Sequence, residues 1–411
     1  MNLNLGGGRR MSTVLLTIIY LAFISLGLPD SLLGASWPVM RQELDAPIEM
    51  AGLLAMTITV GTIVSSLASG AVASRFGTGR VTLASCILTA GALLGFSYAP
   101  SIVWLIACAI PLGLGGGAVD AALNHYVAAH YKARHMSWLH CFWGVGATAG
   151  PMIMASYLSG DASWREGYLA VGGIQFSLVI LLFVTLPLWG SLAKRQGSDL
   201  GAQRTETDAT SGAGQMPHKA KGVPYALATF LFYCGVEATV GLWGSSYLAR
   251  MKGLSVDDAA SWISIYFAGI TIGRFIAGFV TFKVSSLLLI RTGQIATLAG
   301  TMLLLLPLPT GFALGGLLIT GLGLAPIFPS MLHETAARFG EANAGRIMGY
   351  QMAVAYTGMA LLPPLLGLLA AFSTIGIFPL YIVIMALAML LFSERLNILL
   401  RRRVPRADIG G

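Results

Sequence analysis

Long apolar runs follow one another along almost the whole chain, separated by short segments that hold the charges and the Gly and Pro breaks. Each run has roughly 20 residues or more, enough for an α-helix to cross the ~30 Å hydrocarbon core of a bilayer. The sequence therefore predicts an all-α membrane protein. The twelve expected spans are 12–38, 48–73, 80–98, 101–128, 136–158, 165–190, 223–249, 257–282, 286–306, 310–337, 344–370 and 374–396.

One interval, 191–222, breaks this pattern. It consists of Gly, Ser, Thr, Gln and mixed charges without apolar periodicity, which is typical of a flexible linker. The linker divides the chain into an N-terminal six-helix bundle, 1–190, and a C-terminal six-helix bundle with a basic tail, 223–411. Both the linker and the tail are expected in the cytoplasm.

The two halves also share glycine positions. Shifting the sequence by 208 residues places several glycines of the first half on glycines of the second, which suggests an internal repeat. Because six is even, both halves begin on the same side of the membrane, and the repeat predicts two pseudo-symmetric bundles. The coinciding pairs are Gly27 and Gly235, Gly61 and Gly269, Gly70 and Gly278, Gly113 and Gly321, Gly115 and Gly323, and Gly150 and Gly358.

Composition excludes a soluble protein, because 56% of the residues are hydrophobic and only 10% are charged. The net charge of +8 could indicate a nucleic-acid partner, but with a cytoplasmic N-terminus 20 of the 25 Lys and Arg fall on the inner side. This is the positive-inside rule. It predicts that both termini are cytoplasmic. We expect the protein in the inner (plasma) membrane of a bacterium. The basic excess requires no nucleic-acid partner. The first apolar run is too long for a secretory signal and is interpreted as a span.

Three segments carry a resemblance to a known family. The loop after the second span reads Gly70-Ala-Val-Ala-Ser74-Arg75-Phe76-Gly77-Thr78-Gly79-Arg80, the eighth span contains Gly269-Ile-Thr-Ile-Gly273-Arg274, and the fifth ends in Gly150-Pro151. These segments resemble signatures of the major facilitator superfamily. The resemblance implies a cytoplasmic gate formed by Arg75, Arg80 and Arg274. Ser74 stands where a carboxylate is usual, which implies a weaker charge lock.

Two further segments resemble one branch of that superfamily. Leu28-Pro29-Asp30-Ser31-Leu32-Leu33 in the first span and Gly113-Leu-Gly-Gly-Gly-Ala-Val-Asp120-Ala-Ala-Leu-Asn124 in the fourth look like the fucose:proton symporter branch. The likeness implies that Asp30 and Asp120 handle solute and proton. Trp143 occupies the place where the branch has an asparagine. The superfamily implies two bundles around a central cavity, exposed alternately to each side.

Asp120 is the leading candidate for proton coupling. Gly113, Gly117, Asp120 and Asn124 follow helical spacing and share one face of the fourth span. Inside the hydrocarbon, loss of hydration disfavours an ionised carboxyl, so this group can exchange a proton near physiological pH. The alternative is a structural role, with Arg134 or a backbone group as its partner.

Other ionisable groups within the spans are weaker candidates. Asp30 is a second candidate for proton coupling, or a solvated residue at the outer mouth. Glu237, near the middle of the seventh span, lies one position from the repeat partner of Asp30 and could contact solute or a cation. Arg274 is expected to pair with a carboxylate at the inner face of the C-terminal half.

Solute contacts are sought among polar and aromatic residues in the spans. His140 and Trp143 lie on one face of the fifth span, and an aromatic plate beside hydrogen-bonding groups suits a sugar ring. Each aromatic residue has a simpler alternative as a core or interface residue. The candidate solute contacts are Asn124, His140, Trp143, Tyr233, Trp243 and Gln351.

We therefore expect a secondary transporter that moves a small neutral solute, of the monosaccharide type, by proton symport. Sodium coupling is one alternative, and proton-driven export of an amphipathic compound, suggested by the Gly150-Pro151 signature, is another. A receptor or a membrane-embedded enzyme is the third. No HExxH motif or P-loop occurs, so neither an enzyme nor ATP-driven transport is expected. No cofactor or metal is expected, and the partners are the solute and the bilayer, with a functional monomer.

Overall fold

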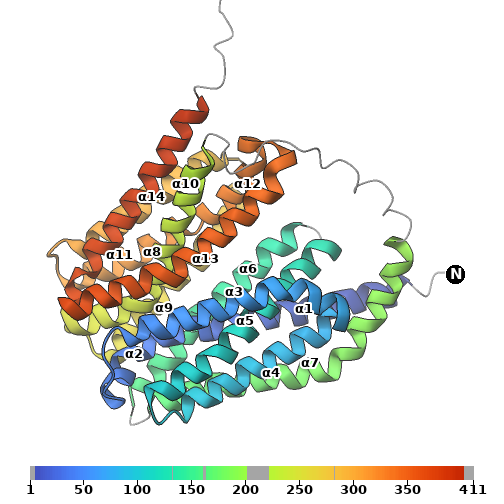
Figure 1. Ribbon diagram of the computed structural model, residues 1–411, viewed down its shortest axis with the longest axis horizontal. Helices are drawn as coiled ribbons and strands as arrows, with labels where there is room; N and C mark the ends of the chain where they lie inside the picture. Colours follow the sequence, from blue (N-terminus) through green and yellow to red (C-terminus); the bar gives the residue numbers. More distant parts are fainter. Residues whose placement is uncertain (1–4, 132, 161–162, 201–221, 282, 402–411) are drawn as a thin grey trace, which may run out of the picture. The chain divides into compact units, whose positions relative to one another are not determined.

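Helices make up all the regular structure in the part of the chain that the computed structural model describes, residues 5–131, 133–160, 163–200, 222–281 and 283–401 (Figure 1). The elements are α1 (Leu5–Asp30), α2 (Leu32–Glu43), α3 (Met50–Phe76), α4 (Thr78–Ser97), α5 (Ile102–His130), α6 (Ala133–Leu158), α7 (Trp164–Leu200), α8 (Val223–Met251), α9 (Val256–Val280), α10 (Ser286–Leu305), α11 (Thr310–Leu324), α12 (Ile327–Phe339), α13 (Glu341–Phe372), the short 3₁₀ helix η2 (Ile375–Ile377) and α14 (Phe378–Arg401).

Within these described residues, eleven helical segments are long and apolar enough to cross a membrane. Two of them, Thr13–Glu43 and Thr310–Phe339, consist of two α-helices in succession. The predicted span 136–158 corresponds to α6, a helix of 26 residues that is not among these eleven segments and that contains several His, Ser, Thr and Gly residues. The prediction of an all-α membrane protein with about a dozen long helices is confirmed.

The start of the predicted linker differs from the structure. Helix α7 continues to Leu200, although the sequence analysis ended the sixth span at residue 190. The reason is local, since residues 191–200 contain Leu, Ala, Lys, Arg and Gln, which favour a helix even outside an apolar run. The rest of the predicted linker, 201–221, lies outside the described residues.

Contacts divide the chain into two units, each with a core of its own. Unit 1 comprises Met1–Ala213 with Ser255–Ser264, and unit 2 comprises Gly214–Leu254 with Ile265–Gly411. Large aromatic side chains are fully buried in both, such as Trp37 and Trp164 in unit 1 and Trp243 and Phe378 in unit 2. Because the surroundings are lipid, many large apolar side chains remain on the outside of these units.

Helix crossings show the internal repeat. At the crossing of α3 and α5, a Cβ added to Gly113 would overlap the carbonyl oxygen of Ile58. Shifted by 208 residues, the same pair becomes Gly321 and Tyr266, and a Cβ on Gly321 would overlap the carbonyl oxygen of Tyr266 at the crossing of α9 and α11. Small residues let the backbones of membrane helices touch in this way. The repeat is therefore a repeat of packing as well as of sequence.

A second crossing keeps the same register. A Cβ on Gly115 of α5 would lie 2.7 Å from the carbonyl oxygen of Ser85 on α4, and one on Gly323 of α11 would lie 2.7 Å from that of Gly293 on α10. Ser85 and Gly293 are again 208 residues apart. The helix triplet α3, α4 and α5 thus packs like the triplet α9, α10 and α11.

We expect Gly113→Ala to destabilise the protein by roughly 1–3 kcal/mol, because its methyl group meets backbone atoms that cannot rotate away. Gly91→Ala on α4 is the matched control, since an added Cβ there meets nothing within 4 Å. The control should be neutral or slightly stabilising, because alanine favours a helix more than glycine does. Unfolding of detergent-solubilised protein followed by tryptophan fluorescence measures both. Equal stability of the two variants would contradict the close approach of α3 and α5.

Candidate functional site

Asp30 is placed by a break in the first span. Helix α1 ends at Asp30, Ser31 is not helical, and α2 begins at Leu32. Pro29 contributes to the break, because a proline within a helix removes one backbone hydrogen bond. The Ser31 hydroxyl donates to the carbonyl oxygen of Leu28 at 3.4 Å. The carboxyl of Asp30 is exposed at this interruption of the helix.

The Asp30 carboxylate has a partner on α6. The indole Nε1 of Trp143 donates a hydrogen bond to Asp30 Oδ2 at 2.8 Å. The two helices touch along a glycine seam formed by Gly27, Gly146 and Gly150, where an added Cβ would overlap or crowd main-chain oxygens of the facing helix. The predicted Gly150-Pro151 segment thus serves to bring α6 against α1.

Asp120 and Asn124 form a second polar pair, on α5. Asn124 Nδ2 donates to Asp120 Oδ1 at 2.9 Å and to the Asp120 carbonyl oxygen at 3.0 Å. Both residues are half-buried. Their separation of four residues is the spacing that places them on one helical face, as the sequence analysis predicted. The side chain of Arg134, the alternative partner for Asp120, lies outside the described residues.

Asp30, Asp120 and Asn124 together form the carboxyl cluster of unit 1. Helices α1 and α5 pack against each other. The two carboxyls are near enough for the charge on Asp120 to act on Asp30, although the sequence analysis took them from different spans. His140 lies on α6 with its ring edge-on to Phe23, at 6.1 Å between ring centroids.

Unit 2 holds a separate ion pair. Arg274 Nη2 on α9 lies 3.2 Å from Glu237 Oε1 on α8, and the two side chains are only 14% and 18% exposed. The same nitrogen lies 3.5 Å from the Tyr233 hydroxyl. The Tyr266 hydroxyl donates to the carbonyl oxygen of Glu237 at 3.1 Å. We call Tyr233, Glu237, Tyr266 and Arg274 the ion-pair cluster of unit 2.

Arg274 pairs with a carboxylate, as expected. Its partner Glu237 is the middle residue of α8, about 20 Å along the helix from either end. A role of Arg274 in a cytoplasmic gate stays a prediction. The sequence analysis did not single out Tyr266, because nothing in the sequence distinguishes it from other aromatic residues in the spans.

Arg75 and Arg80 lie where the short link between α3 and α4 was expected. Both are exposed, and they flank Gly77, whose φ of +85° closes the connection. The Ser74 hydroxyl bonds the carbonyl oxygen of Ala71 in its own helix. No salt bridge of Arg75 or Arg80 occurs among the described residues.

Two predicted solute contacts are enclosed within unit 2. Trp243 is fully buried, and its indole N–H donates to the carbonyl oxygen of Pro363 at 2.8 Å. Tyr233 is 1% exposed, although its hydroxyl reaches Arg274. We therefore leave Trp243 out of the candidate site and retain Tyr233 as part of the ion-pair cluster.

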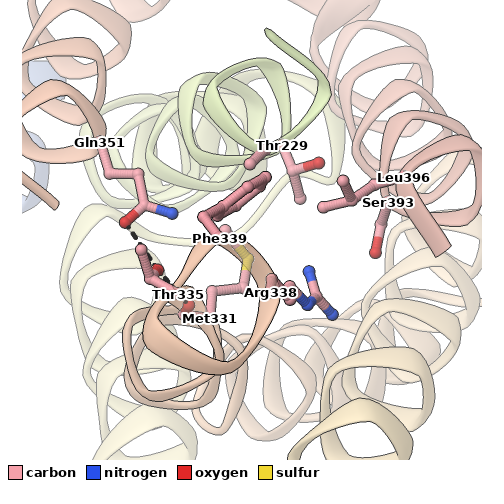
Figure 2. Close-up of a pocket in the computed structure, with 9 residues that line it drawn as sticks. Thr229, Met331, Thr335, Arg338, Phe339, Gln351, Ser393 and Leu396 are labelled. Carbon is pink, nitrogen blue, oxygen red and sulfur yellow. Dashed lines mark hydrogen bonds between the residues drawn. The ribbon is translucent and has the colours of Figure 1, made fainter. Parts of the chain in front are cut away.

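The third, Gln351, lines a small polar chamber between α8, α12, α13 and α14 (Figure 2). Its Oε1 accepts a hydrogen bond from Thr335 at 3.0 Å. Arg338 points toward the same chamber, next to Ser393. The chamber has room for about one water molecule. It is therefore too small for a sugar, and Gln351 is held by Thr335 rather than directed at a solute.

No group of three or more His, Cys, Asp or Glu that could hold a metal ion is found in the described segments. The candidate site consequently rests on carboxyl, amide, indole and guanidinium groups. These groups exchange protons and bind polar solutes, and no arrangement of a nucleophile with a base is found among them.

Comparisons with known proteins come from sequence and from structure. Residues 19–212 and 225–408 match the family model described as Major Facilitator Superfamily. The cis,cis-muconate transport protein of Acinetobacter baylyi is 24% identical, over 87% of each chain. The glucose/mannose transporter GlcP of Bacillus subtilis is 23% identical, over 61% of this chain and 66% of its own. Two further relatives are matched over only 30% and 55% of their lengths.

Among solved structures, a peptide transporter POT in complex with sulfate superposes with a TM-score of 0.73 at 14% identity, over 95% of this chain and 94% of that one. At this identity the likeness shows the fold alone.

Proposed function

The chain belongs to the Major Facilitator Superfamily, and we propose that this membrane transporter moves a small neutral solute of the monosaccharide class together with a proton, by alternating access. The observation that supports the proposal most is the carboxyl cluster of unit 1. It combines Asp30 at a helix break with Asp120 on a second span, and their charges interact. Ionisable groups within spans are rare and are functional candidates by default.

The coupling step follows from the chemistry of the cluster. A carboxyl within a span can carry a proton from one side to the other if it is charged when it faces water and neutral during the passage. Asp120 is suited to this because Asn124 stabilises its position in either state: the amide donates to a carboxylate oxygen or to the carbonyl-type oxygen of the acid. Asp30 is proposed to assist.

The solute class follows from the same groups. Carboxyl oxygens and the Asn124 amide oxygen accept hydrogen bonds from hydroxyl groups, which matches the hydroxyl rim of a sugar. The relative named as a glucose/mannose transporter supports this class. The similarity does not extend to the choice among sugars.

We expect purified protein in liposomes to accumulate a radiolabelled hexose when the lumen is made alkaline relative to the outside. A protonophore should abolish the accumulation, because the proton gradient is its energy source. Replacing the pH gradient with a sodium gradient of equal size is the control and should drive no uptake. Accumulation with sodium alone would contradict proton coupling, and absence of uptake for every hexose tested would contradict the solute class.

A second candidate cargo is a small organic acid. The specific observation is the guanidinium of Arg274 on α9, which has limited exposure, because arginine is well suited to binding carboxylates. The relative named for cis,cis-muconate transport favours the same cargo. Thermal stabilisation by ligands separates the two candidates: hexoses should raise the melting temperature if the first is correct, and carboxylates if the second is.

We also propose that both termini face the cytoplasm and that the protein resides in a bacterial inner membrane. The excess of Lys and Arg on one side of the predicted spans supports this orientation. In this orientation the α3–α4 link, which Arg75 and Arg80 flank, is cytoplasmic.

A further inference from the structure

We propose that Trp143 is a positioning residue for Asp30, not a contact of the solute, and that its indole N–H sets the pH range over which coupled uptake operates. This inference rests on the proposed function. It changes the role expected for Trp143 from its sequence position, where the ring was a candidate plate for a sugar.

The hydrogen bond itself is the first argument. Trp143 Nε1 lies 2.8 Å from Asp30 Oδ2, the distance of a charge-assisted bond. An indole carries a single N–H and accepts no conventional hydrogen bond. While this hydrogen is bonded to Asp30, it cannot also be donated to a solute hydroxyl. The polar function of Trp143 is thus used within the protein.

The packing of α1 against α6 is the second argument. Gly27 lies so close to the Trp143 carbonyl oxygen that a Cβ there would overlap it, and a Cβ on Gly146 would overlap the carbonyl oxygen of Ile24. The donor and the acceptor therefore belong to helices whose backbones are in contact next to the bond. Such a seam holds the indole at a defined distance from the end of α1, where Asp30 precedes the break.

The charged group that acts on Asp30 is Asp120 on α5. The other helices packed against α1 carry ionisable groups with partners elsewhere. His140 on α6 lies one turn from Trp143 and edge-on to Phe23. Tyr168 on α7 has its hydroxyl 3.4 Å from that of Ser36 on α2.

Asp120 and the Trp143 indole have opposite effects on the charge of the Asp30 carboxylate. A second carboxylate nearby opposes the charge on Asp30, whereas the indole N–H stabilises that charge. Without the N–H, the Asp30 carboxyl would hold its proton up to a higher pH. Because Asp30 is proposed to assist Asp120 in loading the coupling proton, the alkaline side of the uptake profile should then move upward by about one pH unit.

The experiment compares pH profiles of proton-driven hexose uptake for the wild type, Trp143→Phe and Trp143→Gln in liposomes. Phe keeps an aromatic ring but lacks the N–H, and Gln restores an N–H donor. We expect Phe to move the alkaline midpoint up by about one pH unit and Gln to move it less. Equilibrium exchange of hexose is measured at acidic pH, where the Asp30 carboxyl is protonated in all variants. It gives the KM for hexose under conditions in which no proton has to be taken up or released.

Trp138→Phe is the matched control, because Trp138 lies on the same helix with 51% of its surface exposed. Its pH profile should match the wild type. An unchanged midpoint for Trp143→Phe would overturn the inference. If the KM of exchange also rose tenfold, Trp143 would be a solute contact. The proposed function is tested separately by Asp120→Asn: if that variant loses coupling while Trp143→Phe keeps the wild-type midpoint, the inference alone fails.

Discussion

Asp120→Asn should abolish proton-driven accumulation of solute and leave exchange of solute across the membrane partly intact. Asparagine cannot take up or release a proton in the working pH range. The imposed pH gradient therefore can no longer drive solute uptake. The fold should survive, because an amide oxygen at position 120 can still accept from Asn124 Nδ2, as the carboxylate does at 2.9 Å. Uptake against a concentration gradient and counterflow, measured on the same liposomes, separate the two activities.

Asp45→Asn provides the control for this substitution. Asp45 is exposed, in the short connection between α2 and α3, with a φ of +46° that asparagine tolerates as well as aspartate does. Its variant should accumulate solute like the wild type. If Asp120→Asn also accumulates solute against a gradient, Asp120 does not carry the coupling proton and the proposed mechanism is wrong.

Arg274→Gln should be the most destabilising of the polar substitutions. It leaves Glu237, which is 18% exposed, without the guanidinium that compensates its charge. Removing one partner of a buried ion pair typically costs about 3–5 kcal/mol, and the partial exposure of this pair favours the lower end. The double variant Glu237→Gln/Arg274→Gln should recover more than half of the loss, because neither buried charge remains. Denaturant unfolding in detergent measures the three proteins.

Arg291→Gln is the matched comparison. Its partner is Glu394, at 2.6 Å, but the arginine is 50% exposed. An exposed pair of this kind contributes about 0–1 kcal/mol. A loss of stability as large in Arg291→Gln as in Arg274→Gln would show that burial is not the cause. Failure of the double variant to recover would show that Glu237 bears no uncompensated charge in the single variant.

The fold could largely be predicted from the sequence, because the bilayer restricts the secondary structure that each membrane-spanning segment can adopt. Apolar runs of the required length must become helices to satisfy their own backbone hydrogen bonds. The shift of 208 residues that aligned Gly113 with Gly321 also corresponds to the same helix crossing in the structure. The end of α7 was missed, since helix propensity extends the helix into residues that hydropathy assigns to a linker.

The candidate site could be predicted from the sequence only in part. Asp120 and Asn124 are four residues apart, so their shared face and their hydrogen bond follow from helical geometry alone. Asp30 and Trp143 were both named as candidates, but 113 residues separate them and no local rule joins them. Glu237 and Arg274 are likewise paired across 37 residues on different helices.

The sequence by itself determined which segments cross the membrane, that the two halves repeat, and which few ionisable groups lie inside the spans. These properties depend on residue type and on spacing along one helix. The tertiary structure decided the partners: Trp143 for Asp30, Glu237 for Arg274, and Pro363 for Trp243. Partners on different helices depend on which faces meet and how closely. Here that is set by glycines whose missing side chains let two backbones touch.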